Sequence, residues 1–155
     1  ARAHGVPVVV DPILGDNGRR YNSVTMEQAE AMKRLVRHAD VITPNLTEAC
    51  LLTDTPFADA DVQALLDKLG ETGKSVLITS VGDTVAGLDV QTGERFCIPF
   101  ERVPGEHWGT GDRFCALLLD GLARKIPLAQ AAKRASDGVY NALKAENPSN
   151  PIDEV

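Results

Sequence analysis

The stretch Asp40-Val41-Ile42-Thr43-Pro44-Asn45-Leu46-Thr47-Glu48-Ala49 changes from strand character to helix character within ten residues. Its β-branched segment Val41-Ile42-Thr43 predicts a short buried strand, which Pro44 ends because proline cannot donate a ladder hydrogen bond. Asn45 can then cap a helix that carries Glu48 and, further on, two leucines. A strand that passes directly into a helix is the repeating unit of α/β folds.

The segments on either side continue this alternation. Residues 6–11 and the segment Val76-Leu77-Ile78-Thr79 are apolar, β-branched runs without alternation, and both predict buried parallel strands. A capping-box pair, Thr25 and Gln28, predicts the start of one helix. Leucines at helical spacing predict a second helix over residues 62–69. We therefore expect an α/β fold with a mostly parallel sheet and right-handed crossovers.

The second half of the chain predicts a hairpin and two more helices. Residues 85–89 and 95–98 flank the sequence Gln-Thr-Gly-Glu, which is typical of an antiparallel hairpin. Apolar residues at helical spacing predict one helix over residues 114–122 and another over residues 128–143. We see no internal repeat and no linker, so the sequence predicts a single domain over residues 1–155.

Composition excludes several classes of function. The chain has 155 residues and a formal net charge of −6, with no Lys/Arg cluster, so it lacks the basic surface that nucleic acid binding requires. No apolar run approaches the ~18 residues of a membrane span and no signal peptide is recognised, which predicts a cytoplasmic protein without a membrane partner. Three distant cysteines predict free thiols. No G-x-G-x-x-G sequence follows a strand, which disfavours a nicotinamide-dependent dehydrogenase.

Polar residues follow the predicted parallel strands at their carboxyl ends, where ligands bind in such sheets. The three strands end at Asp11, Thr43 and Thr79, and Asp16, Asn45, Glu48 and Ser80 come shortly after. Asp16, in the predicted loop 12–21, and Glu48 are hard oxygen ligands suited to Mg²⁺. An alternative stays open from the residues alone, in which Asp16 caps a turn and Glu48 forms a capping box with Asn45.

The sequence Gly109-Thr110-Gly111-Asp112 precedes an apolar helix and is the sharpest motif. Glycines let the backbone approach a ligand, and the helix start offers unpaired N–H groups and the positive end of the helix dipole. Together these features predict a cradle for a phosphate, and Asp112 beside it could accept a proton from an attacking alcohol. The alternative from spacing alone is that Asp112 only caps the helix.

Four motifs together resemble those of the pyridoxal kinases of the ribokinase superfamily. They occur in the same order at residues 11–16, 40–49, 78–80 and 109–112, and they are most similar to the bacterial pyridoxamine kinase type. The resemblance implies a ribokinase-like three-layer αβα fold. It also implies ATP-dependent phosphorylation of the 5′-hydroxymethyl group of pyridoxal, pyridoxamine or pyridoxine, which is a step of vitamin B6 salvage.

The resemblance also implies roles for residues around the phosphates. Asp112 matches the base that takes the proton from the hydroxymethyl group. Residues 109–111 match the anion hole around the γ-phosphate of ATP. Asn45 and Ser80 match nucleotide-phosphate contacts, and Tyr21 matches a tyrosine near the phosphates. Phosphoryl transfer relies on positioning and charge stabilisation more than on covalent chemistry, which agrees with such a set.

Two cation positions are implied in the same way. Asp16 and Glu48 match the acidic residues near Mg²⁺. Asp11, Thr43 and Thr79 match positions that surround a monovalent cation, usually K⁺. These cations would offset the repulsion between an acidic protein and ATP.

Two other functions remain open. Kinases of hydroxymethylpyrimidine are close relatives, but they typically carry Cys where Asp112 stands and lack the Gly15-Asp16 pair. The second is a non-catalytic nucleotide-binding fragment, because the N-terminal strands of the family have no counterpart in this sequence. We therefore expect the chain to be the C-terminal catalytic portion of a longer protein, which alone binds B6 vitamers poorly and has low activity or none. The family's homodimer is a further expectation.

Overall fold

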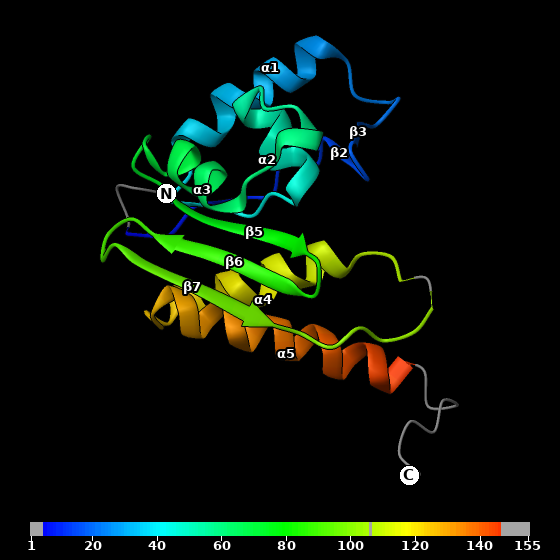
Figure 1. The fold of residues 1–155 in the computed structure, drawn as a ribbon. Coiled ribbons are helices and arrows are strands. Elements are labelled where there is room, and N and C mark those ends of the chain that lie inside the picture. Colours follow the sequence, from blue (N-terminus) through cyan, green and yellow to red (C-terminus); the bar gives the residue numbers. More distant parts are fainter. Residues whose placement is uncertain (1–4, 106, 147–155) are drawn as a thin grey trace. The chain divides into compact units, whose positions relative to one another are not determined.

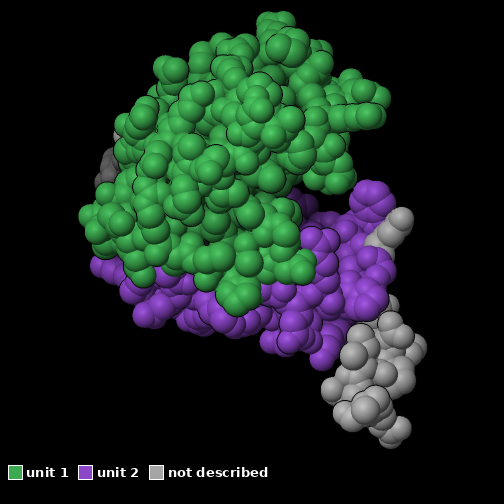
Figure 2. All heavy atoms as spheres, in the orientation of Figure 1, with its two compact units in different colours: residues 1–99 green, residues 100–155 purple. Residues whose placement is uncertain are grey.

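The computed structural model describes residues 5–105 and 107–146. The chain forms two compact units, residues 1–99 and residues 100–155, which Figure 2 shows in different colours. Whether both belong to one domain, as the sequence predicts, stays a prediction.

Unit 1 is built on a five-stranded sheet with the order β1-β4-β5-β6-β7 (Figure 1). Its parallel part consists of β1 (Val9–Val10), β4 (Val41–Ile42) and β5 (Ser75–Val81), with Val10 opposite Ile42 and Ile42 opposite Val76. The antiparallel strands β6 (Thr84–Asp89) and β7 (Glu94–Pro99) extend it on the β5 side. The predicted α/β class, parallel strands and hairpin are confirmed.

The helices of unit 1 begin where capping residues predict. The elements are α1 (Met26–Leu35), η2 (Val36–His38), α2 (Leu46–Thr53), η3 (Phe57–Asp59) and α3 (Val62–Gly70). The side chains of Thr25 and Asn45 each accept a hydrogen bond from the backbone N–H group of the third helical residue. The backbone N–H group of each cap residue in turn donates to the side chain of that third residue, which completes a capping box. Asp61 caps α3 by accepting from the Ala64 N–H group. These caps satisfy N–H groups that would otherwise lack partners.

The core of unit 1 fixes the strands against these helices. Ile42, Val76 and Ile78 from the sheet cluster with apolar residues of the helices, and all three are 0% exposed. Leu65 and Leu66 of α3 belong to the same cluster and are almost completely buried. Close packing of this kind holds the carboxyl ends of β1, β4 and β5 at defined positions.

Residues 12–21 are not the simple loop that the sequence predicts. They contain a second, two-stranded antiparallel sheet of β2 (Gly15–Asp16) and β3 (Arg19–Arg20). Asn17 and Gly18 connect the strands, with φ angles of 52° and 75°. Asn-Gly is the preferred sequence for such a hairpin turn, but strands of two residues carry no hydrophobic alternation that would mark them. The loop prediction is therefore wrong here.

Unit 2 contains the two helices that the sequence predicts, α4 (Thr110–Ala123) and α5 (Leu128–Glu146). They pack closely because Gly121 leaves room for Ala131, whose Cβ would lie 2.9 Å from a Cβ at position 121. Arg113 near the start of α4 forms an ion pair of 2.8 Å with Glu146 at the end of α5, so the helices are antiparallel. The sequence Asn147-Pro148, which by its proline predicts the end of this last helix, lies outside the described residues. None of the described helices is long and apolar enough to span a bilayer.

Candidate functional site

The carboxyl ends of β1, β4 and β5 bring predicted polar residues of unit 1 together. Thr43 is buried directly after β4, and its hydroxyl donates to the Asp11 carboxylate at 3.1 Å. The Thr79 amide donates to the Pro44 carbonyl at 2.8 Å, and Asn45 and Thr79 form a parallel bridge. Three segments that lie far apart in the sequence therefore present oxygen-bearing side chains along one edge of the sheet, where α/β folds bind ligands.

Glu48 is buried at this edge and holds the preceding hairpin to α2. One carboxylate oxygen accepts the Leu14 N–H group at 3.0 Å, and the other accepts the Asn45 N–H group at 2.9 Å. Asn45 in turn accepts from the Glu48 N–H group and donates to the Gly15 carbonyl, both at 2.9 Å. The capping-box alternative for Asn45 and Glu48 is thus the arrangement observed, extended by bonds to residues 30 and 34 positions away.

Asp16 lies on the exposed hairpin and forms turn contacts, as its alternative interpretation predicts. Its two carboxylate oxygens accept from the backbone and side-chain N–H groups of Asn17, at 2.8 and 3.0 Å. The hydroxyl of buried Thr47 accepts the Gly18 N–H group at 2.9 Å and ties the turn to α2. Sequence reasoning missed Thr47 as a positioning residue. In the sequence its only signal was a hydroxyl side chain at the second helical position. The burial of that side chain is evident only in the structure.

Carboxylates and a phenol are electrostatically coupled in this region. Burial raises the pKa of Glu48 to about 7, and the negative charge of Asp11 adds to this rise, while three backbone N–H groups oppose it. Burial is also the largest cause that raises the pKa of Tyr21, and the negative charges of Asp16, Glu48 and Asp11 raise it further. The negative charges at this edge of the sheet therefore repel one another, and a bound cation would lower that repulsion.

These oxygen donors fit a cation that keeps much of its coordination for other ligands. Within the described part of the chain, no three His, Cys, Asp or Glu side chains converge as a preformed metal site. Asp16 is exposed, whereas both Glu48 oxygens already accept backbone N–H groups. Mg²⁺ typically binds one or two carboxylates and completes its shell with water and substrate phosphates. The donor set fits that mode and does not fit a closed protein cage.

Ser80 departs from regular strand geometry next to this edge. It has a φ angle of 58°, and the β5–β6 register shifts between Ile78 and Val81. A positive φ at a residue other than glycine costs free energy and persists only where the surroundings enforce it. The irregularity leaves Ser80 exposed at the end of β5 instead of paired in the ladder.

The glycine motif starts α4 in unit 2 without a side-chain cap. Gly109 is the N-cap residue, with φ 73° and ψ 14°, and its carbonyl accepts the Arg113 N–H group at 3.1 Å. Side chains of Thr25, Asn45 and Asp61 cap α1, α2 and α3, whereas no side chain caps α4 within the described residues. The first N–H groups of α4 thus keep their capacity to bind an anion.

Asp112 is exposed in the first turn of α4. It lies in a different unit from the acidic edge, and its role as the catalytic base stays a prediction. The assignments of Gly109, Thr110 and Gly111 to an anion hole also stay predictions.

A stability prediction follows from the double role of Asn45. Asn45→Ala removes a helix cap and the bond to the Gly15 carbonyl, and we expect it to lower the free energy of unfolding by about 2 kcal/mol. Asp61→Ala removes only a cap of α3 and should cost about 1 kcal/mol. Urea denaturation of both variants and of Asn45→Asp, which keeps the cap, measures the difference. Equal losses in the two alanine variants would contradict the role of the Gly15 bond.

Residues 1–152 match the protein family described as phosphomethylpyrimidine kinase. The chain belongs to this family. Among its curated relatives, a pyridoxine/pyridoxal/pyridoxamine kinase of Bordetella avium is 33% identical over 89% of this chain and 49% of its own length. A pyridoxal kinase of Arabidopsis thaliana is 34% identical over 88% of this chain and 47% of its own length. A hydroxymethylpyrimidine/phosphomethylpyrimidine kinase of Rhizobium meliloti is 30% identical over 93% and 57%.

Solved structures of the family have the same fold. A pyridoxal kinase from Lactobacillus plantarum matches with a TM-score of 0.83 and 36% identity, over 94% of this chain and 55% of that one. A pyridoxal kinase from Leishmania donovani in complex with ADP and pyridoxamine matches with a TM-score of 0.69 and 28% identity, over 94% and 52%. The predicted resemblance and the ribokinase-like fold class are confirmed. The chain spans about half the length of the curated relatives it matches.

Proposed function

We propose that this chain forms the ATP-binding and phosphoryl-transfer part of a kinase acting on the 5′-hydroxymethyl group of pyridoxal, pyridoxamine or pyridoxine. The observation that carries the proposal is the start of α4, a glycine-bounded helix N-terminus without a side-chain cap and with Asp112 in its first turn. Membership of a kinase family and the pyridoxal kinases among the relatives support the choice of substrate.

Each residue of the motif has a defined task in this proposal. The N–H groups of Thr110, Gly111 and Asp112, together with the helix dipole, hold the γ-phosphoryl group and stabilise its charge during transfer. The Asp112 carboxylate accepts the proton of the substrate hydroxyl. The hydroxyl oxygen forms a bond to the γ-phosphorus while the bond from that phosphorus to the oxygen bridging it to the β-phosphorus breaks, which releases ADP.

The acidic edge of unit 1 supplies cation positions. Asp16 and Glu48 would hold Mg²⁺ through carboxylate oxygens and water, and bound Mg²⁺ supplies charge neutralisation of the phosphates. The oxygens of Asp11, Thr43 and Thr79 would surround K⁺. Nucleotide phosphates would contact the residues next to this edge, namely Asn45, Ser80 and Tyr21.

A second function is supported by a specific observation. The matching family is described by phosphomethylpyrimidine, and a hydroxymethylpyrimidine kinase is among the relatives at 30% identity. Hydroxymethylpyrimidine also carries a primary hydroxyl on a heteroaromatic ring, so the same cradle and base could serve it. The resemblance noted above for Asp112, where those kinases typically carry Cys, favours the B6 vitamers.

One experiment separates the candidate functions. Calorimetry measures binding of Mg·ATP to the chain, and a coupled assay measures ADP formation with each B6 vitamer and with hydroxymethylpyrimidine. We expect saturable Mg·ATP binding and only slow turnover of B6 vitamers, because the chain spans about half the length of its curated relatives and is expected to bind the vitamers poorly. Turnover of hydroxymethylpyrimidine alone would establish the second function, and Mg·ATP binding without turnover would establish a non-catalytic nucleotide-binding protein. Absence of Mg·ATP binding would contradict all three.

Two further properties belong to the proposal. Free thiols at Cys50, Cys97 and Cys115 are typical of a reducing compartment, which supports a cytoplasmic protein. The homodimer implied by the family resemblance stays a prediction, and light scattering of the purified chain tests it.

A further inference from the structure

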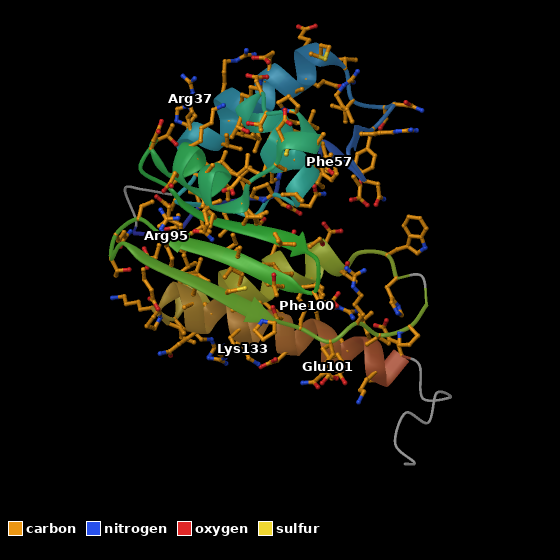
Figure 3. The ribbon with its side chains drawn as sticks, in the orientation of Figure 1. Arg37, Phe57, Arg95, Phe100, Glu101 and Lys133 are labelled. Carbon is orange, nitrogen blue, oxygen red and sulfur yellow. The ribbon has the colours of Figure 1, made fainter. Side chains whose placement is uncertain are left out.

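A pocket of about 430 Å³ lies in unit 1, away from the edge described above. It opens between α1, α2 and α3, close to the amino end of β5. Lys74, which lines the pocket, immediately precedes β5, whereas Thr79 and Ser80 lie at the opposite end of that strand. At ~3.3 Å per strand residue, the two ends are roughly 17 Å apart. Arg37 also lines the pocket. In Figure 3 it lies on the opposite side of unit 1 from Phe57, whose ring is next to the hairpin glycine Gly18.

The pocket is strongly cationic although the chain as a whole has a net charge of −6. Five basic side chains and two carboxylates line it, which leaves a local excess of three positive charges. The basic residues are Lys33, Arg34, Arg37, Lys68 and Lys74. The two carboxylates, Glu30 and Asp54, both pair with Lys33, at 2.8 and 2.6 Å. The excess charge therefore resides on the other four basic residues, of which Lys68 donates to the Thr53 carbonyl.

Lys74 is the unusual member of this set. Its residue is only 2% exposed, and within the described part of the chain its ammonium has no hydrogen-bond or ion-pair partner. Among the described residues, the only enclosed side-chain atom without a partner is the Ser136 hydroxyl, so the Lys74 ammonium is not completely enclosed. Burial lowers the pKa of Lys74, and the charge of Arg37 lowers it further. Lys74 and Arg37 therefore line the same pocket and lie close enough for their positive charges to repel each other.

An unpaired buried charge costs free energy, and lysine is almost never buried unless it is paired. An anion placed between Lys74 and Arg37 would remove both the desolvation cost and the repulsion. Two threonines and four apolar residues complete the lining, and three of the apolar residues, Val36, Ile42 and Leu69, belong to the core cluster. The volume lies in the range of small-molecule sites. The lining therefore suits a molecule with an anionic group at one end and an apolar body at the other.

We propose that this pocket is a second ligand site, which binds a small organic phosphate through Lys74 and Arg37 and packs its apolar part on the floor of the pocket. The proposal does not depend on the kinase function. The site lies at the amino end of the parallel strands, so its ligand does not compete for the groups at the carboxyl edge.

Thermal unfolding in the presence of phenyl phosphate tests the site, because a ligand that binds only the folded chain raises its Tm. We expect a saturable rise in Tm with phenyl phosphate, a smaller rise with inorganic phosphate and none with phenol. Lys74→Met should raise the Tm of the unliganded chain by removing an unpaired buried charge, and should abolish the response to phenyl phosphate. Arg37→Gln, at an exposed position, should weaken binding on the order of tenfold.

Arg134→Gln is the matched control, since it removes one exposed positive charge from α5 outside the pocket. It should bind phenyl phosphate as the unmodified chain does. A response that persists in Lys74→Met would place phosphate binding elsewhere, at the start of α4 for instance, and would overturn the proposal. Equal responses to phenyl phosphate and inorganic phosphate would show an adventitious ion only. Absence of any saturable response in the unmodified chain would also overturn the proposal.

Discussion

Asp112→Asn is expected to lower the turnover of B6 vitamers by about 10²–10⁴-fold, the usual contribution of a general base. The amide has the same shape as the carboxylate but cannot accept the substrate proton. The helix start and its N–H groups remain, so Mg·ATP should still bind. Its affinity should rise, because a negative charge beside the phosphate cradle is removed. Coupled kinetics measure the turnover and calorimetry measures the affinity.

Asp120→Asn is the control for this experiment. Asp120 is an exposed carboxylate near the other end of α4, where it pairs with Arg124 at 3.0 Å. The control should leave both turnover and nucleotide affinity unchanged, since an exposed ion pair of this kind contributes little. Turnover of Asp112→Asn within about twofold of the unmodified chain would contradict the role of Asp112 as the base.

The second large effect concerns pH and Glu48. Without divalent cations, we expect the free energy of unfolding to fall by about 3 kcal/mol between pH 4.5 and pH 7 through this one residue. The folded chain keeps the Glu48 proton until pH is about 7, whereas the unfolded chain loses it near 4.5. Between these values the folded state binds more protons, so raising the pH favours unfolding. Above pH 7 the contribution levels off, because both states are ionised.

Urea denaturation across this pH range measures the effect as a difference between variants. Glu48→Gln cannot titrate, so its stability relative to the unmodified chain should improve by about 3 kcal/mol as the pH rises from 4.5 to 8. At low pH it should be the less stable of the two, since a Gln amide cannot accept backbone N–H groups with both of its terminal atoms. Glu71→Gln, at an exposed position, is the control. A difference that does not vary with pH would contradict a raised pKa.

Much of the fold could be predicted from the sequence because its signals are local. The bonds between Thr25 and Gln28 span three residues, so the sequence of α1 contains its own start signal. The same holds for Asn45 and for the helical spacing of α4 and α5. β-branched runs predicted β4 and β5 because only a buried strand accommodates them without alternation. Sequence patterns also placed Asp11, Thr43 and Thr79 at one edge, because parallel strands end at the same side of a sheet.

The environment of Glu48 could not be predicted in the same way. Its capping bond to Asn45 is local, but its bond to the Leu14 N–H group joins residues 34 positions apart. That contact depends on a β2–β3 hairpin too short to carry a hydrophobic pattern. The raised pKa results from the burial that the folded chain creates around the carboxylate.

Lys74 is a second side chain whose environment could not be predicted from the sequence. In the sequence it is one lysine in a Thr-Gly-Lys-Ser turn, and nothing nearby in the chain distinguishes it from a solvated residue. Its burial and its proximity to Arg37 arise only when η2 and α3 come together with the start of β5 around the pocket. Local order is encoded in neighbouring residues through hydrogen bonds and side-chain periodicity. The charge state of a side chain depends on which distant segments exclude water from it. Only the folding of the whole unit brings those segments together.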